Sequence, residues 1–282
     1  MNTFFLDRLN GEPHALAFAG QSTPWPVALT DQSANPVLNE ALHAHADAAQ
    51  ALLYPVSADL LATTGRPVDL FGFEPNPARL GAAAAASASV PGIALAQLGA
   101  LLDAASLGYN PAVAKPVAVL GHSQGVLAVH MVQSIVEAGS IEAASAQIDE
   151  ILAIATLIGV AGTRQARQLG LAARHGEATP MLSVKDITRA QVDALIKRVS
   201  GARGPIAVAV TNSATHYVLS GYPEDLAAFG VEVDKEHKHQ AKLREEKVRG
   251  GRVFDPTLEY LDVTLPFHSP LMADAVSQAV AW

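Results

Sequence analysis

Between Val117 and Val136 an apolar strand, a tight turn and an apolar helix follow one another. The run Val117–Leu120 predicts a buried strand, and Val126–Val136 has the composition of a helix. Between them stands Gly121-His-Ser-Gln-Gly125, whose glycines permit a strained turn and close packing of the helix on the strand. Such a turn pushes the Ser123 hydroxyl out of the sheet and places it at a helix N-terminus, where free N–H groups favour negative charge. Ser123 therefore has the setting of a nucleophile.

Composition limits the class of protein. The chain has 282 residues, of which 50% are hydrophobic and 16% charged, so it can bury a sizeable core. The net charge of −8 argues against nucleic acid as the main partner, and the absence of cysteine excludes thiol chemistry and disulfides. Because polar residues and proline interrupt every long apolar run, we expect a soluble, cytoplasmic protein with no membrane partner.

The N-terminal part alternates strands with helices, which is the order of an α/β protein with a parallel sheet. Ala15–Ala19 predicts a first strand, followed by the polar turn Gly20-Gln-Ser-Thr-Pro24. Predicted helices cover Asn35–Leu61, Val90–Leu107 (with Pro91 in its first turn) and Ile148–Leu169.

From about Thr179 the predicted order becomes β-α-β-β-α-β, as in a ferredoxin-like subdomain. The strands are expected at Met181–Val184, Ile206–Val210, His216–Ser220 and Leu258–Val263, and the helices at Thr188–Val199 and from Pro223 onward. The fold class predicted is therefore α/β. An α/β-hydrolase-like large subdomain (residues 1–178) would carry an inserted ferredoxin-like subdomain (179–263), before the chain returns to the large subdomain (264–282).

The segment Asp234–Arg252 is dense in charge of both signs. His237 and His239 could be imagined as metal ligands. Mixed charge without apolar periodicity is more typical of a solvated loop or a fraying helix, and we predict no metal site.

Short segments in a fixed order carry a family resemblance along nearly the whole chain. They are Phe18-Ala-Gly-Gln21, Pro91-Gly-Ile-Ala-Leu-Ala-Gln-Leu98, Gly121-His-Ser-Gln-Gly125, Leu157-Ile-Gly-Val160, Pro180-Met-Leu-Ser183, Val210-Thr-Asn212, Val218-Leu-Ser-Gly221 and Pro266-Phe-His-Ser-Pro-Leu-Met272. Together they resemble the acyltransferase domains of fatty acid synthases, specifically the acetyltransferase of the fungal-type, single-complex synthases that some actinobacteria also have.

The chain departs from that family at two places. The first turn of the family reads G-Q-G, whereas this chain has Gly20-Gln21-Ser22. The family's large subdomain also continues well beyond the histidine of Pro266-Phe-His-Ser, and its later part includes a backbone carbonyl that orients this histidine. We therefore expect this chain to be an N-terminal piece of a longer synthase.

A serine alcohol needs a base to remove its proton. The resemblance implies that His268 is this base. A histidine that binds a loop carbonyl is the alternative interpretation. We expect His122, beside the nucleophile, to support the turn and line the pocket. The other histidines in competition are His14, His43, His45, His130, His175, His216, His237 and His239.

Acyl transfer also needs donors for the oxyanion. The backbone N–H of Gln124 follows the nucleophile directly and is one candidate. The resemblance implies the backbone N–H of Gln21 as the second, although Gln21 could be an ordinary turn residue. In both residues we expect the side chain to be secondary.

The resemblance also bears on the acyl group. Malonyl-selective relatives carry an arginine that can pair a carboxylate, and Ile158 stands at that position here. An apolar pocket predicts a neutral short acyl group, acetyl first, although Ile158 could simply pack in the core. Arg164 and Arg167 lie further along the same predicted helix. Arg164, if turned into the cleft, would favour a malonyl or long-chain acyl group. Asn212 matches an asparagine on the pantetheine side of the cleft, and an ordinary hairpin-turn asparagine is the alternative.

The reaction implied is ping-pong transfer from acetyl-CoA, through an acyl-serine on Ser123, to the phosphopantetheine thiol of an acyl carrier protein. No permanently bound cofactor is expected, and the remaining domains of the synthase are expected partners. Three alternatives remain open: a malonyl or long-chain transferase, a serine hydrolase with Asp255 or Asp262 as its acid, and a non-catalytic module of a large assembly.

Overall fold

The computed structural model describes residues 4–21, 24–65, 67, 69–70, 86–171, 178–199, 201–245 and 254–282. They form a mixed α/β protein, as the sequence predicts. The chain divides into two compact units, one of residues 1–164 with 278–282 and the other of residues 165–277. Each unit is described by itself.

The first unit contains a pair of parallel strands, β1 (Ala15–Phe18) and β2 (Ala118–Gly121). Their register places Ala15 opposite Ala118 and Phe18 opposite Gly121. A short 3-10 helix, η3 (Ser123–Gly125), follows β2 and leads directly into α8 (Val126–Ala138). The strand, turn and helix predicted around Ser123 are therefore confirmed.

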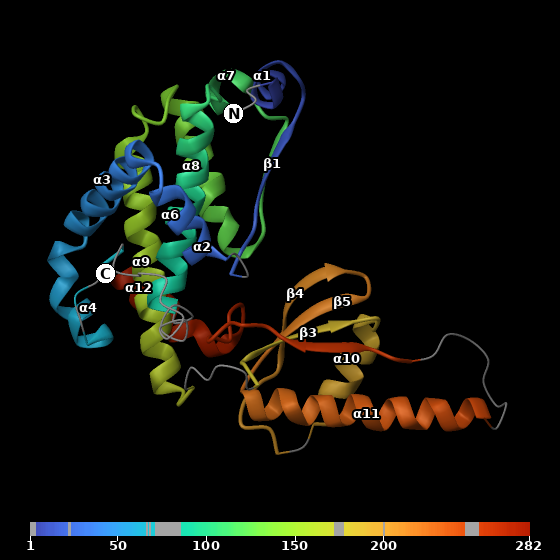
Figure 1. The fold of residues 1–282 in the computed structure, drawn as a ribbon. Coiled ribbons are helices and arrows are strands. Elements are labelled where there is room, and N and C mark those ends of the chain that lie inside the picture. The colour runs from blue at the N-terminus through green and yellow to red at the C-terminus, as the bar shows by residue number, and fades with distance from the viewer. Residues whose placement is uncertain are drawn as a thin grey trace. The chain divides into compact units, whose positions relative to one another are not determined.

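Helices make up most of the rest of this unit, and both α6 (Ala86–Ser106) and α7 (Pro111–Ala114) contact α8 (Figure 1). The long helix α6 is buried over most of its length and packs against α2, α3 and α8. The other helices of this unit are α1 (Phe4–Gly11), α2 (Trp25–Ser33), α3 (Pro36–Leu52), η1 (Tyr54–Val56) and α4 (Ser57–Thr64) among the described residues. Two more helices belong to both units: α9 (Ser145–Gln168) begins in the first and ends in the second, and α12 (Ala273–Ala281) begins in the second and ends in the first.

Two of these helices, α6 and α9, are long and apolar enough by length and composition to span a membrane. In α6, however, 72% of the most apolar window is buried inside the protein, and in α9 56% is buried. Core helices of globular proteins pass the same test, so this finding is weak evidence for a membrane span.

Two helical predictions for this unit need correction. The helix expected over Asn35–Leu61 is interrupted after Leu52, where Pro55 falls within the 3-10 turn η1, and resumes as α4. Pro91 lies inside α6 rather than in its first turn, because the helix begins earlier, at Ala86.

The second unit is built on a four-stranded sheet in the order β4-β5-β3-β6, with every neighbouring pair antiparallel. Its elements follow the predicted order β-α-β-β-α-β. They are β3 (Met181–Lys185), α10 (Arg189–Ile196), β4 (Ala207–Ser213), β5 (His216–Ser220), α11 (Pro223–Glu245) and β6 (Thr257–Tyr260). Thr188 caps α10 in a capping box with Gln191, which explains why the sequence located the start of this helix.

The two faces of this sheet differ. Both α10 and α11 cover one face (Figure 1), where Val192, Leu195 and Phe229 pack against alternate residues of the strands, such as Leu182 and Leu219. Met181, Val218 and Val263 form a smaller cluster on the other face, and Phe267 packs against it. The segment that leads to His268 is therefore packed on the face of the sheet opposite α10 and α11.

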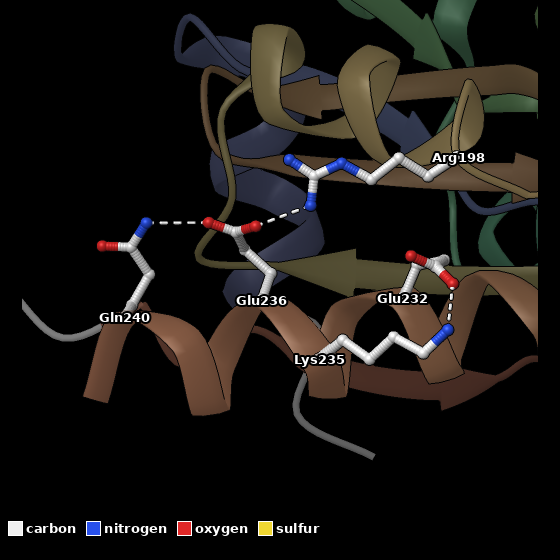
Figure 2. A network of polar contacts seen from close by, with 5 residues as sticks. All are labelled: Arg198, Glu232, Lys235, Glu236 and Gln240. Carbon is white, nitrogen blue, oxygen red and sulfur yellow. Dashed lines mark hydrogen bonds and ion pairs between the residues drawn. The ribbon is translucent and has the colours of Figure 1, made fainter. Parts of the chain in front are cut away.

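The charged segment is more ordered than the sequence predicts, because α11 continues to Glu245. Figure 2 shows how the helix is held: Arg198, which follows α10, pairs with Glu236 at 2.6 Å, and Gln240 donates to the same carboxylate at 2.7 Å. Lys235 pairs with Glu232 along the helix. Partners within and beside the helix thus satisfy these charges. Residues 246–252 of the predicted solvated segment lie outside the described residues.

The division of the chain differs from the predicted boundaries at 178/179 and 263/264, which both fall inside the second unit. Hydrogen bonds explain part of the difference. Gln165 near the end of α9 donates to the Leu271 carbonyl at 2.9 Å, and Arg203 donates to the Leu169 carbonyl at 2.9 Å. These bonds tie the end of α9 and the segment after His268 to the second unit.

The Glu236 network predicts a pH-dependent stability term. The hydrogen bond from Gln240 is the largest cause that lowers the pKa of Glu236, and the bond from Arg198 is the next. The ionised carboxylate therefore stabilises the folded protein above the unfolded-state pKa of this group. That stabilisation is lost as the pH falls through the folded-state pKa. We expect Glu236→Gln to lower the unfolding free energy by about 0.5–1 kcal/mol at pH 7. The difference from wild type should shrink as the pH falls below the ordinary pKa of a glutamate carboxyl and vanish once Glu236 is protonated in the folded protein. Urea titrations at several pH values measure it.

Glu232→Gln is the matched control, since it removes the same charge from the same helix. Its ion pair with Lys235 joins no second element, so the loss should be smaller. A loss for Glu236→Gln that does not change with pH would contradict the assignment.

Candidate active site

Ser123 sits at the tip of the turn in a strained backbone conformation. Its φ is 52°, in the left-handed region that residues other than glycine rarely adopt. The N–H of Gly125 donates to the His122 carbonyl at 3.0 Å and closes the turn, and α8 starts at the next residue. Ser123 is half-buried, and its helix N-terminus supplies the favourable dipole that the sequence predicted.

The turn after β1 lies directly against the turn after β2. A Cβ on Gly20 would stand 2.8 Å from the His122 carbonyl oxygen and 3.2 Å from the Ser123 Cβ. A Cβ on Gly125 would overlap the Phe18 carbonyl. Only glycine permits this approach, which brings the candidate donor residues Gln21 and Gln124 together. Ser22, which stands where the family has its second glycine, lies outside the described residues.

The side chains of Gln21 and Gln124 are joined to each other and to α6. The Gln21 Nε2 donates to the Gln124 Oε1, and the Gln124 Nε2 donates to the Val90 carbonyl. Ser89 Oγ donates to the Gln21 Oε1 at 3.1 Å. Because the Val90 carbonyl can only accept, the orientation of both amides follows from it.

Sequence reasoning gave no role to Ser89 and Gln97. Gln97 is 7% exposed, and its Nε2 donates to the Ala19 carbonyl at 2.7 Å, next to the turn after β1. The signal in the sequence was a polar amide inside an apolar helix, because a buried polar group needs a partner.

His268 belongs to the second unit, whereas Ser123 belongs to the first. Its backbone is also left-handed, with φ of 56°. Ser269 Oγ donates to the Pro266 carbonyl at 2.7 Å across this turn. Phe267 packs against the Met181 cluster and holds the turn on the sheet. His268 thus lies on a well-held turn, and its pairing with Ser123 stays a prediction.

Other histidines that competed for the role of base have partners elsewhere. The ring of His14 contacts Tyr109 and the Glu12 carbonyl, and the ring of His45 contacts Asp149. The ring of His216 contacts Ser183, and the ring of His237 contacts the Phe254 carbonyl. His122 is exposed, and its backbone supports the turn: its N–H donates to the Phe18 carbonyl at 2.9 Å. His175 lies outside the described residues.

Ile158 lies on α9 with 37% of its surface exposed, so it is not a simple core residue. The next residue, Gly159, packs against the first residues of α6, where a Cβ would overlap the Ala86 carbonyl. Arg164, which would have favoured malonyl if it entered the cleft, is exposed and donates to Gln278 at 3.0 Å.

Asn212 lies in β4, because this strand continues to Ser213, and the turn to β5 is formed by Ala214 and Thr215. The interpretation as a hairpin-turn asparagine is therefore wrong. Its Nδ2 lies 3.4 Å from the His216 Nε2, which also contacts Ser183 Oγ at 3.1 Å.

The structure does not favour Asp255 as the acid of a hydrolase triad. Its carboxylate is 78% exposed and lies 3.5 Å from the His237 Nδ1. Asp262 is exposed as well. Within the described ranges, no group of histidine and acidic side chains has the arrangement of a metal site.

Sequence comparison matches residues 180–260 to the central acyltransferase domain of fatty acid synthases. The fatty acid synthase beta subunit hexB of Dothistroma septosporum is 26% identical over 164 residues, which cover 54% of this chain and 8% of that protein. Fatty acid synthase 2 of Mycosarcoma maydis is 29% identical over 175 residues, covering 58% of this chain and 5% of that protein. The chain thus spans less than a tenth of these curated relatives.

Solved structures share the fold. MCAT from Mycobacterium tuberculosis superposes with a TM-score of 0.56 at 20% identity, over 96% of this chain and 69% of that one. The malonyl CoA-acyl carrier protein transacylase of Coxiella burnetii gives 0.57 at 20% identity, over 96% and 67%. A type II polyketide synthase malonyl-transacylase, solved in complex with its acyl-carrier protein, gives 0.55 at 16% identity, over 96% and 69%. The resemblance to an acyltransferase domain of a fatty acid synthase is confirmed.

The contact between the two turns predicts a sharp effect of Gly125→Ala. A methyl group there would overlap the Phe18 carbonyl, so β1 and the turn must separate. We expect a loss of about 1–3 kcal/mol of unfolding free energy, and loss of Ser123 labelling by a fluorophosphonate. Gly11→Ala, where a Cβ meets no atom within 4 Å, is the control and should change neither measurement. Normal labelling of the Gly125 variant would refute the tight fit.

Proposed function

We propose that this chain, an acyltransferase domain of the fatty acid synthase family, moves an acetyl group from acetyl-CoA to the phosphopantetheine thiol of an acyl carrier protein. The contact of the Gly20-Gln21 turn with the Ser123 turn carries the proposal. It brings two residues with candidate N–H donors beside a serine that is strained and placed at a helix N-terminus.

In the first half-reaction, His268 accepts the proton of Ser123 as its Oγ attacks the thioester carbon of acetyl-CoA. The carbonyl oxygen becomes an oxyanion, which the backbone N–H groups of Gln21 and Gln124 bind. The C–S bond then breaks, and the protonated His268 returns its proton to the sulfur of CoA. The product is an acetyl ester on Ser123.

In the second half-reaction, His268 takes the proton of the phosphopantetheine thiol, and the sulfur attacks the ester carbon. The bond from that carbon to the Ser123 Oγ breaks, and the oxygen regains its proton from His268. Transfer exceeds hydrolysis only where water is excluded from the ester. We infer that Asn212 and His122 line the route of the pantetheine arm.

The preference for acetyl over malonyl rests on Ile158. An isoleucine offers no donor to a carboxylate, and leaving one unpaired in a pocket would be costly. The hydrogen bond from Arg164 to Gln278 supports the same choice, because it holds the Arg164 guanidinium at the protein surface. The solved neighbours that are malonyl transferases share the fold, and a malonyl or long-chain transferase is the alternative that the experiments below test.

The context of the reaction is part of the proposal. A structural neighbour was solved in complex with its acyl-carrier protein, one sequence relative is a fatty acid synthase beta subunit, and another is a fatty acid synthase. We infer that this chain works beside other domains of such a synthase in the cytoplasm, with no permanently bound cofactor. We also infer an α/β-hydrolase-like large subdomain, supported by the parallel pair β1 and β2, and a ferredoxin-like small one, supported by the sheet order.

The proposal predicts a serine-dependent adduct. After a brief incubation with acetyl-CoA, intact-mass measurement should show one acetyl group on the wild-type protein and none on Ser123→Ala. Malonyl-CoA should give little adduct. Rapid loss of the acetyl group to water without carrier protein would favour a hydrolase, and equal labelling by both thioesters would refute the selectivity.

The acyl preference should follow residue 158. Ile158→Arg should raise the ratio of malonyl to acetyl labelling by about tenfold or more, because a guanidinium can bind a carboxylate with two hydrogen bonds. Ile154→Arg is the matched control. It places the same charge one turn earlier on α9, at a position 49% exposed, and should leave the ratio unchanged. A shift in the control equal to that in Ile158→Arg would show a general charge effect.

A further inference from the structure

The backbone alone fixes only part of the arrangement around Ser123. Parallel pairing holds β1 to β2 as far as Phe18 and Gly121, and the N–H of His122 extends it by one bond to the Phe18 carbonyl. Gln21 and Gln124 come after the end of this pairing, on separate turns. The separation of their N–H groups therefore depends on contacts other than the strand ladder.

Side chains supply those contacts in a closed circuit. It runs from Ser89 Oγ to the Gln21 Oε1, from the Gln21 Nε2 to the Gln124 Oε1, and from the Gln124 Nε2 to the Val90 carbonyl. Ser89 and Val90 are neighbours in α6, so the circuit begins and ends at one place. Each amide uses both its donor and its acceptor, and neither can flip without breaking two bonds.

Gln97 adds a second attachment, two turns further along α6. Its Nε2 donates to the Ala19 carbonyl, which directly precedes the glycine of the first turn. Its buried Oε1 has no hydrogen-bond partner among the described residues, and burying an unpaired polar atom costs free energy. An apolar side chain of the same length would avoid that cost but would leave the Ala19 carbonyl without this donor, so the benefit of the glutamine lies in its bond to the first turn.

From this geometry we propose that Ser89, Gln97 and the side chains of Gln21 and Gln124 are positioning residues. They hold the two turns on α6 and so set the separation of the two backbone N–H groups that receive the oxyanion. An oxyanion site is effective only when its donors are held in place before the charge develops. This inference rests on the proposed function for the identity of the substrate, but not for the reactivity of Ser123.

The test uses two readouts on the full chain. One is the rate of Ser123 labelling by a fluorophosphonate, in which the serine oxygen displaces fluoride and the phosphoryl oxygen occupies the oxyanion site. The other is the rate of acetylation by acetyl-CoA. Unfolding temperature is measured on every variant, because a merely structural role would lower it together with the rates.

Ser89→Ala and Gln97→Met should each lower both rates by about tenfold or more, with KM for acetyl-CoA little changed. Their unfolding temperatures should stay within about 2 °C of wild type. Gln21→Met and Gln124→Met should be no worse together than either alone, because each breaks the same circuit.

Two matched controls make the same substitutions outside the circuit. Ser106→Ala, at the far end of α6, removes a hydroxyl that donates to the Asp103 carbonyl. Gln133→Met, on α8, removes an exposed amide that donates to Glu137. Both should keep the two rates within about twofold of wild type.

Rates within twofold of wild type for Ser89→Ala and Gln97→Met would overturn the inference. Rates that fall only in proportion to a lowered unfolding temperature would also overturn it. The same holds for additive losses when Gln21→Met and Gln124→Met are combined, and for a wild-type protein that the fluorophosphonate does not label. If the wild type reacts with the fluorophosphonate but not with acetyl-CoA, the proposed function fails. The positioning role is then decided by the fluorophosphonate rates alone.

Discussion

The Phe18 carbonyl lies between two turns that can approach each other only because positions 20 and 125 are glycines. It accepts the N–H of His122, and it occupies the space that a Cβ on Gly125 would need. Gly121 is held just as closely, since its Cβ would stand 2.5 Å from the Gly125 carbonyl carbon. The left-handed conformation of Ser123 is stable in this setting because strand pairing, glycine contacts and the start of α8 all fix it.

The parts of the fold that the sequence predicted well are those with strong local signals. The glycines at 121 and 125, the apolar strand before them and the capping box at Thr188 each act over a few residues, and each element they predict is present. The end of α11 was missed because its second half has no apolar periodicity. Contacts from Arg198 and along the helix itself stabilise it there.

The candidate site was predictable only in outline. Motifs gave Ser123 and the neighbouring turn, because both lie next to glycines with a clear backbone function. The hydrogen bonds among residues 19–21, 89–97 and 124 join segments far apart in sequence, and no local pattern encodes such pairing. The isolated amide of Gln97 in an apolar helix was the one available signal, and it shows that a partner exists without showing which one.

The start of α6 also supports α9, which carries Ile158, the residue proposed to set the acyl preference. Gly159 packs against the Ala86 carbonyl, and the Ser87 N–H donates to Thr163 Oγ1 at 2.9 Å, so α9 is attached where the circuit of Ser89 begins. One end of one helix therefore holds both Ile158 and the turns of Gln21 and Gln124. Because packed backbones transmit displacement, a change at residue 158 that moves α9 should also disturb the proposed oxyanion donors. Under the proposed function, selectivity and rate are then coupled through α6, and a side chain at position 158 must suit the acyl group without shifting α9.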